Sequence, residues 1–195
     1  MKISKLTALV FVLAAVLYSP KVDAQNVPNI LEIGRESRSR LVRVNPLAEA
    51  YYNRGNALRE SGDIKGEIEF YNKALRINPN YVEAYFNRGN ALRKLGDMKR
   101  AIEDYNQALR INPNYAEAYL NRGATRAQLE DMKGGIEDFN EALRINPKYA
   151  EAYLNRGNAL RKSGDTKEAI EDYNQALRIN PNYAEAYYNR GVNAD

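Results

Sequence analysis

The most regular chemistry in this sequence comes from asparagines that occur in pairs, such as Asn87 and Asn90. A primary amide donates and accepts hydrogen bonds at the same time, so a row of amides suits the backbone of an extended peptide whatever its sequence. Similar pairs occur before and after this one, at Asn53 and Asn56 and at Asn155 and Asn158. Recognition of a polypeptide is therefore the chemistry that this pattern favours.

Catalysis and metal binding have little support in the composition. The chain has no histidine and no cysteine, which excludes histidine bases, Ser-His-Asp chemistry, thiolate nucleophiles, disulfides and the usual zinc ligands. Carboxylates, lysines and tyrosines remain, but nearly all of them recur at one fixed interval and so have a structural reason to be present. No glycine-rich phosphate loop is found. We expect no enzyme, no cofactor and no metal site.

The charge balance argues against nucleic acid as a partner. Lys and Arg number 29 and Asp and Glu 25, for a net charge of +4. A protein that binds a duplex usually carries a concentrated basic stripe, whereas here acidic residues follow the arginines in every copy of the repeating pattern. We expect a protein or peptide partner.

The fixed interval identifies the elements that must position these side chains. Arg-Gly pairs recur every 34 residues, and Asn-Pro pairs keep the same period. The chain thus holds four copies of one unit and the start of a fifth. A unit of this size cannot bury its own apolar face and becomes stable only by stacking on its neighbours. Function should lie on a surface that the stack creates.

The second copy predicts a helix hairpin. Apolar and small residues with helical spacing predict a first helix over 82–95, which Asn80 with Glu83 could cap as a capping box. Gly96 then ends this helix and Asp97 caps the second one, which runs to Asn112 and the following proline. Each repeat is therefore expected to be two antiparallel helices.

The residues that carry this pattern are Tyr85, Arg88, Gly89, Leu92, Ala101, Tyr105 and Pro113. Their spacing resembles the tetratricopeptide repeat. The resemblance implies an all-α, right-handed superhelical solenoid over 48–195, with repeats at 48–81, 82–115, 116–149 and 150–183 and a partial repeat at 184–195. Small residues are expected where two helices cross closely, with tyrosines filling the wider gaps.

The resemblance also implies a peptide-binding groove, because the family's first helices line the concave side of its superhelix. The corresponding residues here are Tyr52, Asn53, Asn56, Phe86, Asn87, Asn90, Lys94, Leu120, Asn121, Leu154, Asn155, Asn158, Lys162 and Tyr188. In this interpretation the asparagines contact a peptide backbone and the apolar row provides pockets. Recurrent glutamates nearby argue against a clamp for a terminal carboxylate. The alternative is that these are unselected surface residues of nearly identical copies.

One departure from the family recurs in every copy, since Arg stands where the family prefers Leu. The affected residues are Arg54, Arg88, Arg122, Arg156 and Arg190. They could form a row of cations for an acidic ligand, but we favour a structural role in which each stem packs on the core and each guanidinium reaches water or an acid. Asp104, Asp138 and Asp172 are candidate partners. Phe70 occupies the matching place in the first copy, so pairing cannot be obligatory.

The third copy departs further from the pattern. Arg126 replaces a buried Leu, Glu130 replaces the helix-ending Gly, and Gly134 and Gly135 enter the second helix. A glycine inside a helix costs about 1 kcal/mol relative to alanine. We expect this copy to be the least stable, either as a hinge or as drift that its neighbours tolerate.

The N-terminus resembles a secretory signal. Lysines precede an apolar run over 6–18, and Val22-Asp23-Ala24 fits a cleavage site. The run is short of the roughly 20 residues that span a bilayer. We therefore expect a signal peptide at 1–24, a mature protein beginning at Gln25 in the periplasm or outside the cell, and no stable membrane insertion. Residues 25–47 are expected to form a degenerate capping helix.

Taken together, these features predict an exported, bacterial type of tetratricopeptide repeat protein that serves as a scaffold for protein interactions. The alternative is a chaperone-like holder of unfolded or transiting polypeptides in the cell envelope, with an enzyme a distant third. The last helix lacks a covering second helix in this sequence, so end-to-end self-association through that face is a further expectation.

Overall fold

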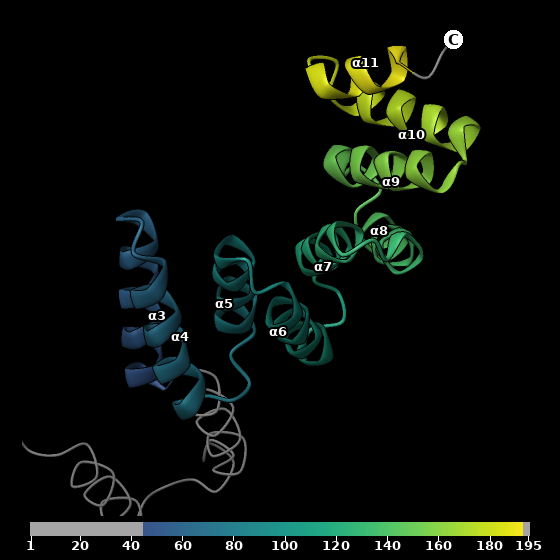
Figure 1. Cartoon of the computed structure of the whole chain (residues 1–195). Helices are drawn as coiled ribbons and strands as arrows, with labels where there is room; N and C mark the ends of the chain where they lie inside the picture. The colour runs from purple at the N-terminus through teal and green to yellow at the C-terminus, as the bar shows by residue number, and fades with distance from the viewer. Residues whose placement is uncertain (1–44, 193–195) are drawn as a thin grey trace, which may run out of the picture. The chain divides into compact units, whose positions relative to one another are not determined.

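The computed structural model describes residues 45–192, and these residues form nine α-helices (Figure 1). The helices are α3 Pro46–Glu60, α4 Ile64–Ile77, α5 Val82–Leu95, α6 Met98–Ile111, α7 Ala116–Gln128, α8 Met132–Ile145, α9 Ala150–Ser163, α10 Thr166–Ile179 and α11 Ala184–Gly191. The expected signal peptide and most of the expected capping helix lie outside the described residues. Helix α3 begins at Pro46, ahead of the expected repeat start at 48, because the Asn45 side chain accepts a hydrogen bond from the Leu47 amide and proline suits the first helical position.

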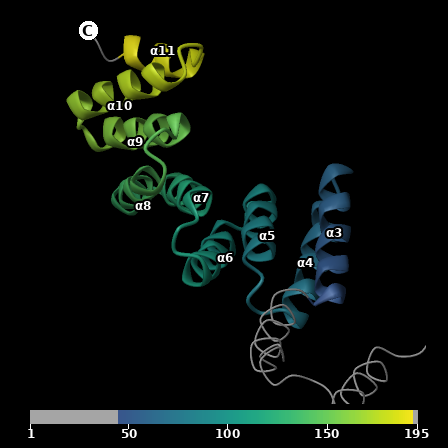
Figure 2. The same ribbon diagram turned by 180° about the vertical axis from the view of Figure 1, so that it is seen from behind.

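The helices pack in consecutive pairs, which are α3 with α4, α5 with α6, α7 with α8 and α9 with α10. Each second helix also packs against the first helix of the next copy, and the view from behind shows the same succession (Figure 2). The first helices contact one another as well, α5 with α7 and α7 with α9. The predicted all-α array of helix hairpins is confirmed. None of the helices in residues 45–192 is long and apolar enough to cross a membrane.

Small residues mark the crossing of the two helices in a copy, as the sequence predicted. A Cβ atom on Gly89 would lie 2.8 Å from Cε1 of Tyr105 and 3.3 Å from the carbonyl oxygen of Ala101. Tyr105 and Ala101 are both fully buried. The glycine therefore leaves room for the tyrosine ring, and the tyrosine fills the gap between the helices.

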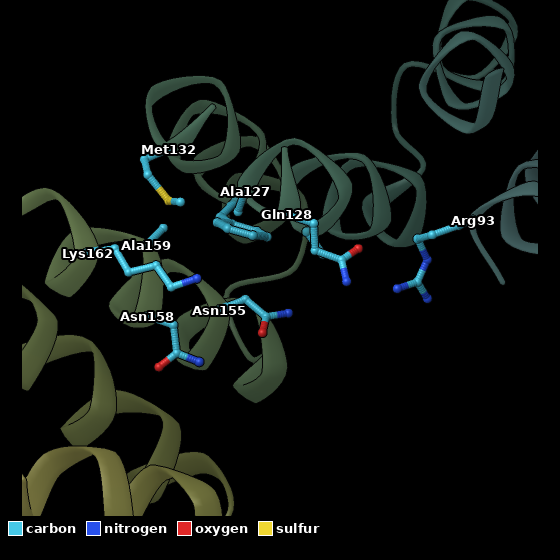
Figure 3. A pocket seen from close by; sticks show the side chains of 10 residues that line it. Arg93, Ala127, Gln128, Met132, Asn155, Asn158, Ala159 and Lys162 are labelled. Atoms are coloured by element: carbon cyan, nitrogen blue, oxygen red, sulfur yellow. The ribbon is translucent and has the colours of Figure 1, made fainter. Parts of the chain in front are cut away.

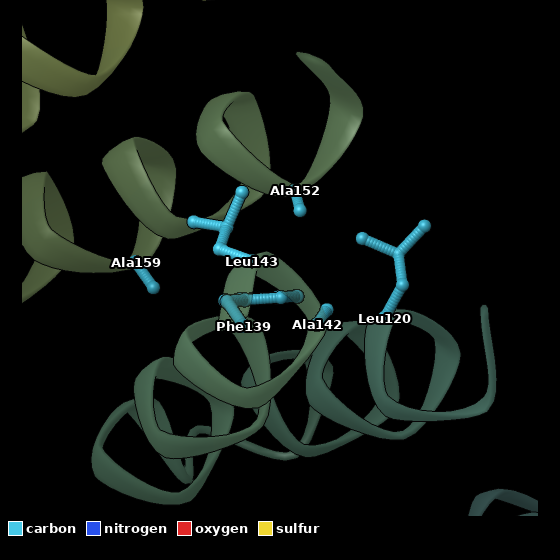
Figure 4. Packing of buried hydrophobic residues seen from close by; sticks show 6 residues of the cluster. All are labelled: Leu120, Phe139, Ala142, Leu143, Ala152 and Ala159. Atoms are coloured by element: carbon cyan, nitrogen blue, oxygen red, sulfur yellow. The ribbon is translucent and has the colours of Figure 1, made fainter. Parts of the chain in front are cut away.

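Adjacent copies share one apolar core. One buried cluster joins residues of α7, α8 and α9, with Leu120 and Phe139 facing Ala152 and Ala159 (Figure 4). Because each copy needs its neighbour to bury this surface, stability is cooperative along the stack.

Helix ends follow the predicted signals, with one correction. Gly96 ends α5 in the left-handed region, with φ of 90°, and the Asp97 side chain caps α6 by accepting from the Arg100 amide. The predicted capping box at Asn80 is wrong, because α5 has Tyr81 at its N-cap and no side chain caps it. Instead, Oδ1 of Asn78 accepts from the Asn80 amide and closes the turn between repeats.

The recurrent arginine joins two successive copies. In the second copy Nε and Nη2 of Arg88 donate to the two carboxylate oxygens of Asp104, at 2.7 and 2.6 Å, and Nη1 donates to Asn72 of the previous copy. The guanidinium also lies 5.5 Å from the centre of the Tyr85 ring. Asp104 is buried, and this burial raises the pKa of its carboxyl group, an effect that Arg88 opposes.

The same arrangement recurs in the later copies. The pairs are Arg122 with Asp138 and Arg156 with Asp172, and the links to the previous copy are Arg122 to Asn106, Arg156 to Asn140 and Arg190 to Asn174. The predicted structural role of these arginines is confirmed. In the first copy Phe70 takes the place of the aspartate, with its ring centre 6.0 Å from that of Tyr51, and Arg54 is exposed. Pairing is therefore not obligatory, as expected.

The third copy compensates for part of its unusual sequence. Nη1 of Arg126 lies 2.9 Å from Oδ2 of Asp138, so two arginines hold this one aspartate. Glu130 adopts a φ of 66°, where glycines stand in the other copies. Gly135, expected to weaken α8, sits where α8 approaches α7 closely, since a Cβ there would lie 3.0 Å from the carbonyl oxygen of Gly123. We therefore expect Glu130, and not Gly135, to lower the stability of this copy.

Candidate functional site

The paired asparagines form a hydrogen-bonded network along the side of the array made by the first helices, which we call the first-helix face. In the second copy Oδ1 of Asn90 accepts from the Tyr105 hydroxyl at 2.8 Å and from Nδ2 of Asn121 at 2.9 Å. Tyr105 belongs to the second helix of the same copy and Asn121 to the first helix of the next. One amide therefore joins three helices.

The network recurs in the first and fourth copies. Oδ1 of Asn56 accepts from the Tyr71 hydroxyl, and Oδ1 of Asn158 accepts from the Tyr173 hydroxyl. The next first helix donates again, through Asn87 to Asn56 at 3.4 Å and through Asn189 to Asn158 at 2.8 Å. Asn87 also donates to the Tyr52 hydroxyl.

These contacts change the interpretation of the asparagine row. The sequence predicted amides that hydrogen-bond a ligand backbone, whereas most of them hydrogen-bond one another and the buried tyrosines. Asn87 is itself buried. Asn53 is exposed, and it remains available to a ligand together with the exposed lysines Lys94 and Lys162.

The apolar row is also used mainly for packing between copies. Leu120 and Leu154 are only 3% and 2% exposed, so the prediction that they provide open apolar pockets is wrong. The ring of Phe86 lies 4.8 Å from that of Tyr115, and the ring of Tyr52 lies 4.9 Å from that of Tyr81, centre to centre. The side chains of this apolar row are covered by the tyrosine at the start of the first helix in the next copy. A helical projection of a single copy does not show this contact. Tyr188 is the exception, with 71% of its surface exposed.

The network is interrupted in the third copy by three changes at neighbouring positions. Phe139 stands in the place of the buried tyrosine, Ala124 in the place of its asparagine partner, and Ala127 in the place of an arginine. The arginines of the other copies are Arg59, Arg93 and Arg161. Since the hydroxyl and its acceptor are lost together, neither leaves a buried polar group without a hydrogen bond.

A hollow of about 200 Å³ opens where these side chains are missing (Figure 3). Its apolar lining comes from Ala124, Ala127, Phe139, Met132 and Ala159, which belong to α7, α8 and α9.

Asn155 and Asn158 face this hollow with Gln128 and Lys162, and Arg93 of the previous copy completes the lining (Figure 3). The two charged side chains in the lining are thus both cations.

Asn155 is the counterpart of Asn121, but its acceptor has been replaced by Ala124. Within residues 45–192 its side chain makes no hydrogen bond to protein, while it remains half-buried at the hollow. Its amide keeps both a donor and an acceptor for a ligand. Of the predicted groove residues, the structure therefore brings Asn155, Asn158 and Lys162 together at one place.

In the copies where the network is complete, the buried tyrosines have raised pKa values. Burial raises the pKa of Tyr105 to about 12, and the nearby guanidinium of Arg93 opposes this rise. Burial likewise raises the pKa of Tyr71 to about 12, with Arg59 opposing. The tyrosines therefore stay protonated and act as hydrogen-bond donors at neutral pH, and neither has the lowered pKa of an activated nucleophile. In the described part of the chain, no group of three or more carboxylates could hold a metal ion.

The fold and this face define a helical-repeat protein whose extended surface offers contacts from several copies. The family model described as tetratricopeptide repeat matches residues 82–115, and the one described as TPR repeat matches residues 55–96, 126–164 and 157–192. The chain belongs to the tetratricopeptide repeat family. This is a family of protein-interaction domains that are typically non-catalytic.

Solved structures of the same fold include a crystal structure of MamA, with 29% identity over 71% of this chain and 81% of that one and a TM-score of 0.69. The TPR domain of Arabidopsis OM64 is 29% identical, with a TM-score of 0.57, over 57% of this chain and 93% of that one. The first TPR domain of Spaghetti (RPAP3), bound to the HSP90 peptide SRMEEVD, is 27% identical, with a TM-score of 0.57, over 57% and 89%. A comparison with curated proteins gave no match.

Sequence reasoning missed the residues that form the hollow. Ala124, Ala127 and Phe139 differ from their counterparts in every other full copy, and that joint departure was the available signal. This signal is weak because small and apolar residues carry no chemistry by themselves, while their position beside one another becomes evident only in the folded repeat.

Proposed function

We propose that this chain is a scaffold for protein interactions that binds an extended peptide segment of a partner along the first-helix face. The observation that carries the proposal is the hollow between α7 and α9. It combines an apolar floor with the free amide of Asn155 and the exposed ammonium group of Lys162. Small ligand sites are commonly concave and apolar with a few polar groups that fix orientation. The relative RPAP3, whose TPR domain is described with a bound peptide, supports the same mode.

We further propose that the protein acts outside the cytoplasm of a bacterial cell. The support is the charged start, the short apolar run and the Val22-Asp23-Ala24 sequence. Intact-mass measurement of the secreted protein should give a mature chain that starts at Gln25. Retention of residues 1–24 in a membrane fraction would contradict this proposal.

A pull-down with the mature protein from an envelope extract tests the scaffold role. Reversing two charges on the first-helix face, with Lys94→Glu and Lys162→Glu, should remove the partners that the native chain retains. The matched control is Lys99→Glu with Lys133→Glu, which makes the same charge change at exposed positions on α6 and α8.

Loss of partners in the first variant alone supports the proposal, and equal retention by both variants would contradict it. Many clients with exposed chains, in place of one or a few partners, would indicate the chaperone-like role.

A further inference from the structure

We infer that the hollow of the third copy is a specificity pocket for one large apolar side chain, and that this side chain lies next to acidic residues in the bound peptide. This inference rests on the proposed peptide-binding function and adds the chemistry of the ligand. It follows from three properties of the hollow, which are its origin, its lining and its charge.

The origin of the hollow shows that space has been opened by the joint loss of a tyrosine hydroxyl and its asparagine acceptor. Replacing an asparagine and an arginine with Ala124 and Ala127 removes most of two side chains from a single location. Phe139 removes the hydroxyl that would otherwise lose its acceptor. The result is an apolar cavity wall in place of the hydrogen-bonded network found in the copies on both sides.

The lining favours an apolar occupant of branched or aromatic shape. Methyl groups of three alanines, the Phe139 ring and the Met132 thioether surround the space, and Met adapts its shape readily to a ligand. An apolar side chain that leaves water for this site is stabilised in proportion to the area it buries. A polar side chain would lose hydrogen bonds to water and find few in return.

The charged residues at the rim of the hollow determine which peptide residues are favoured beside the apolar side chain. Arg93 and Lys162 are the charged residues of the lining, and both favour carboxylates on the peptide. The Asn155 amide lines the same hollow and is free to donate to and accept from the peptide backbone. An acidic peptide with one apolar residue can therefore fill the apolar lining, hydrogen-bond the Asn155 amide and pair with the two cations at the same time.

Selection from a random peptide library displayed on phage tests the inference with a defined probe. The full mature chain should enrich peptides with one Leu, Met, Ile or Phe beside Asp or Glu. The enriched peptide should bind at least about tenfold more tightly than its copy with alanine at the apolar position, the difference expected for burying one such side chain.

The variant Ala127→Leu fills the hollow without changing its charge, and it should lose this preference for the apolar residue. The matched control, Arg59→Leu, places leucine at the equivalent position of the first copy and should keep it. A second variant, Ala124→Asn with Ala127→Arg and Phe139→Tyr, restores residues that other copies carry and so is expected to fold; it too should lose the preference. Lys162→Gln should weaken binding and reduce its dependence on salt.

Each outcome decides a different claim. If peptides are enriched without an apolar residue, or bind Ala127→Leu as tightly as the native chain, the pocket is overturned while peptide binding stands. If neither the native chain nor any variant enriches peptides, the pocket and the proposed function are both overturned.

Discussion

The second and third copies have the same helices and the same arginine–aspartate pair, yet their first-helix faces differ in kind. In the second copy Tyr105, Asn90 and Asn121 satisfy one another across three helices. In the third copy Phe139 and Ala124 replace the first two, and Asn155 remains without a partner in the described residues. The comparison indicates that the polar face stabilises the stack where it is complete and becomes available to a ligand where it is interrupted.

The copies also differ in how they hold the buried aspartate, and this gives the largest expected effect. Arg88→Leu leaves Asp104 buried without its counter-charge and should reduce the free energy of unfolding by about 3 kcal/mol. Arg122→Leu should reduce it less, because Arg126 still pairs with Asp138. Urea unfolding of both variants measures the difference.

The first copy provides the control for this prediction. Arg54→Leu should change the stability little, since Phe70 occupies the place of the aspartate and the arginine is exposed. Equal losses in all three variants would show that the arginine stem, and not the ion pair, stabilises the stack.

A second difference lies at the helix crossing of the first copy, where Glu67 replaces the small residue found as Ala101 in the second. Glu67 is 1% exposed and its Oε2 has no hydrogen bond within the described residues. Glu67→Ala should therefore raise the free energy of unfolding at neutral pH by about 1–2 kcal/mol.

The pH dependence of this gain follows from the direction of the pKa shift. Burial raises the pKa of Glu67, although Lys94 and Arg59 oppose the rise. The folded native chain therefore binds a proton more tightly than the unfolded chain, and its stability relative to the variant increases as the pH falls through the raised pKa. Unfolding curves of both proteins at neutral and mildly acidic pH should show the gain shrinking; a gain that grows in acid would contradict the assignment.

The end of α7 offers a smaller change. Glu130→Gly removes a side chain from the left-handed region, where Gly96 and Gly164 end the equivalent helices, and should stabilise the third copy by about 1 kcal/mol. Hydrogen exchange of amides in 116–147 should slow accordingly. Gly96→Ala is the reverse change in the second copy, at a site with no close neighbours, and should accelerate exchange there. If hydrogen exchange is unchanged in both variants, backbone strain at Glu130 does not lower the stability of the third copy.

The last difference concerns the hydrogen-bonded network itself, through the coupling between two of its side chains. Asn90→Ala and Tyr105→Phe should each reduce the free energy of unfolding by about 0.5–1.5 kcal/mol, and the double variant should lose less than the sum, because the third copy tolerates this same combination. A double-mutant cycle by urea unfolding measures the coupling. Strict additivity would mean that the hydroxyl and the amide do not act as a unit.

The repeat register, the helix bounds and the structural role of the arginines could be predicted because they follow from periodicity within one copy. The contacts between copies could not. Asn87 and Leu154 look exposed when one helix is projected alone, but Asn87 hydrogen-bonds the previous copy and Leu154 packs against Tyr183 of the next one. Prediction of the hollow requires knowing that positions 124, 127 and 139 meet in space. Their separation along two helices does not reveal this.

Alanine-methyl NMR of the mature chain, titrated with a peptide enriched from the library, tests the central claim most directly. The account predicts that the methyl signals of Ala124, Ala127 and Ala159 shift on binding, while those of Ala57 and Ala91, at equivalent first helices with a complete network, stay in place. Equal shifts along every first helix, or shifts confined to other copies, would contradict the claim that ligand binding concentrates where the network is interrupted.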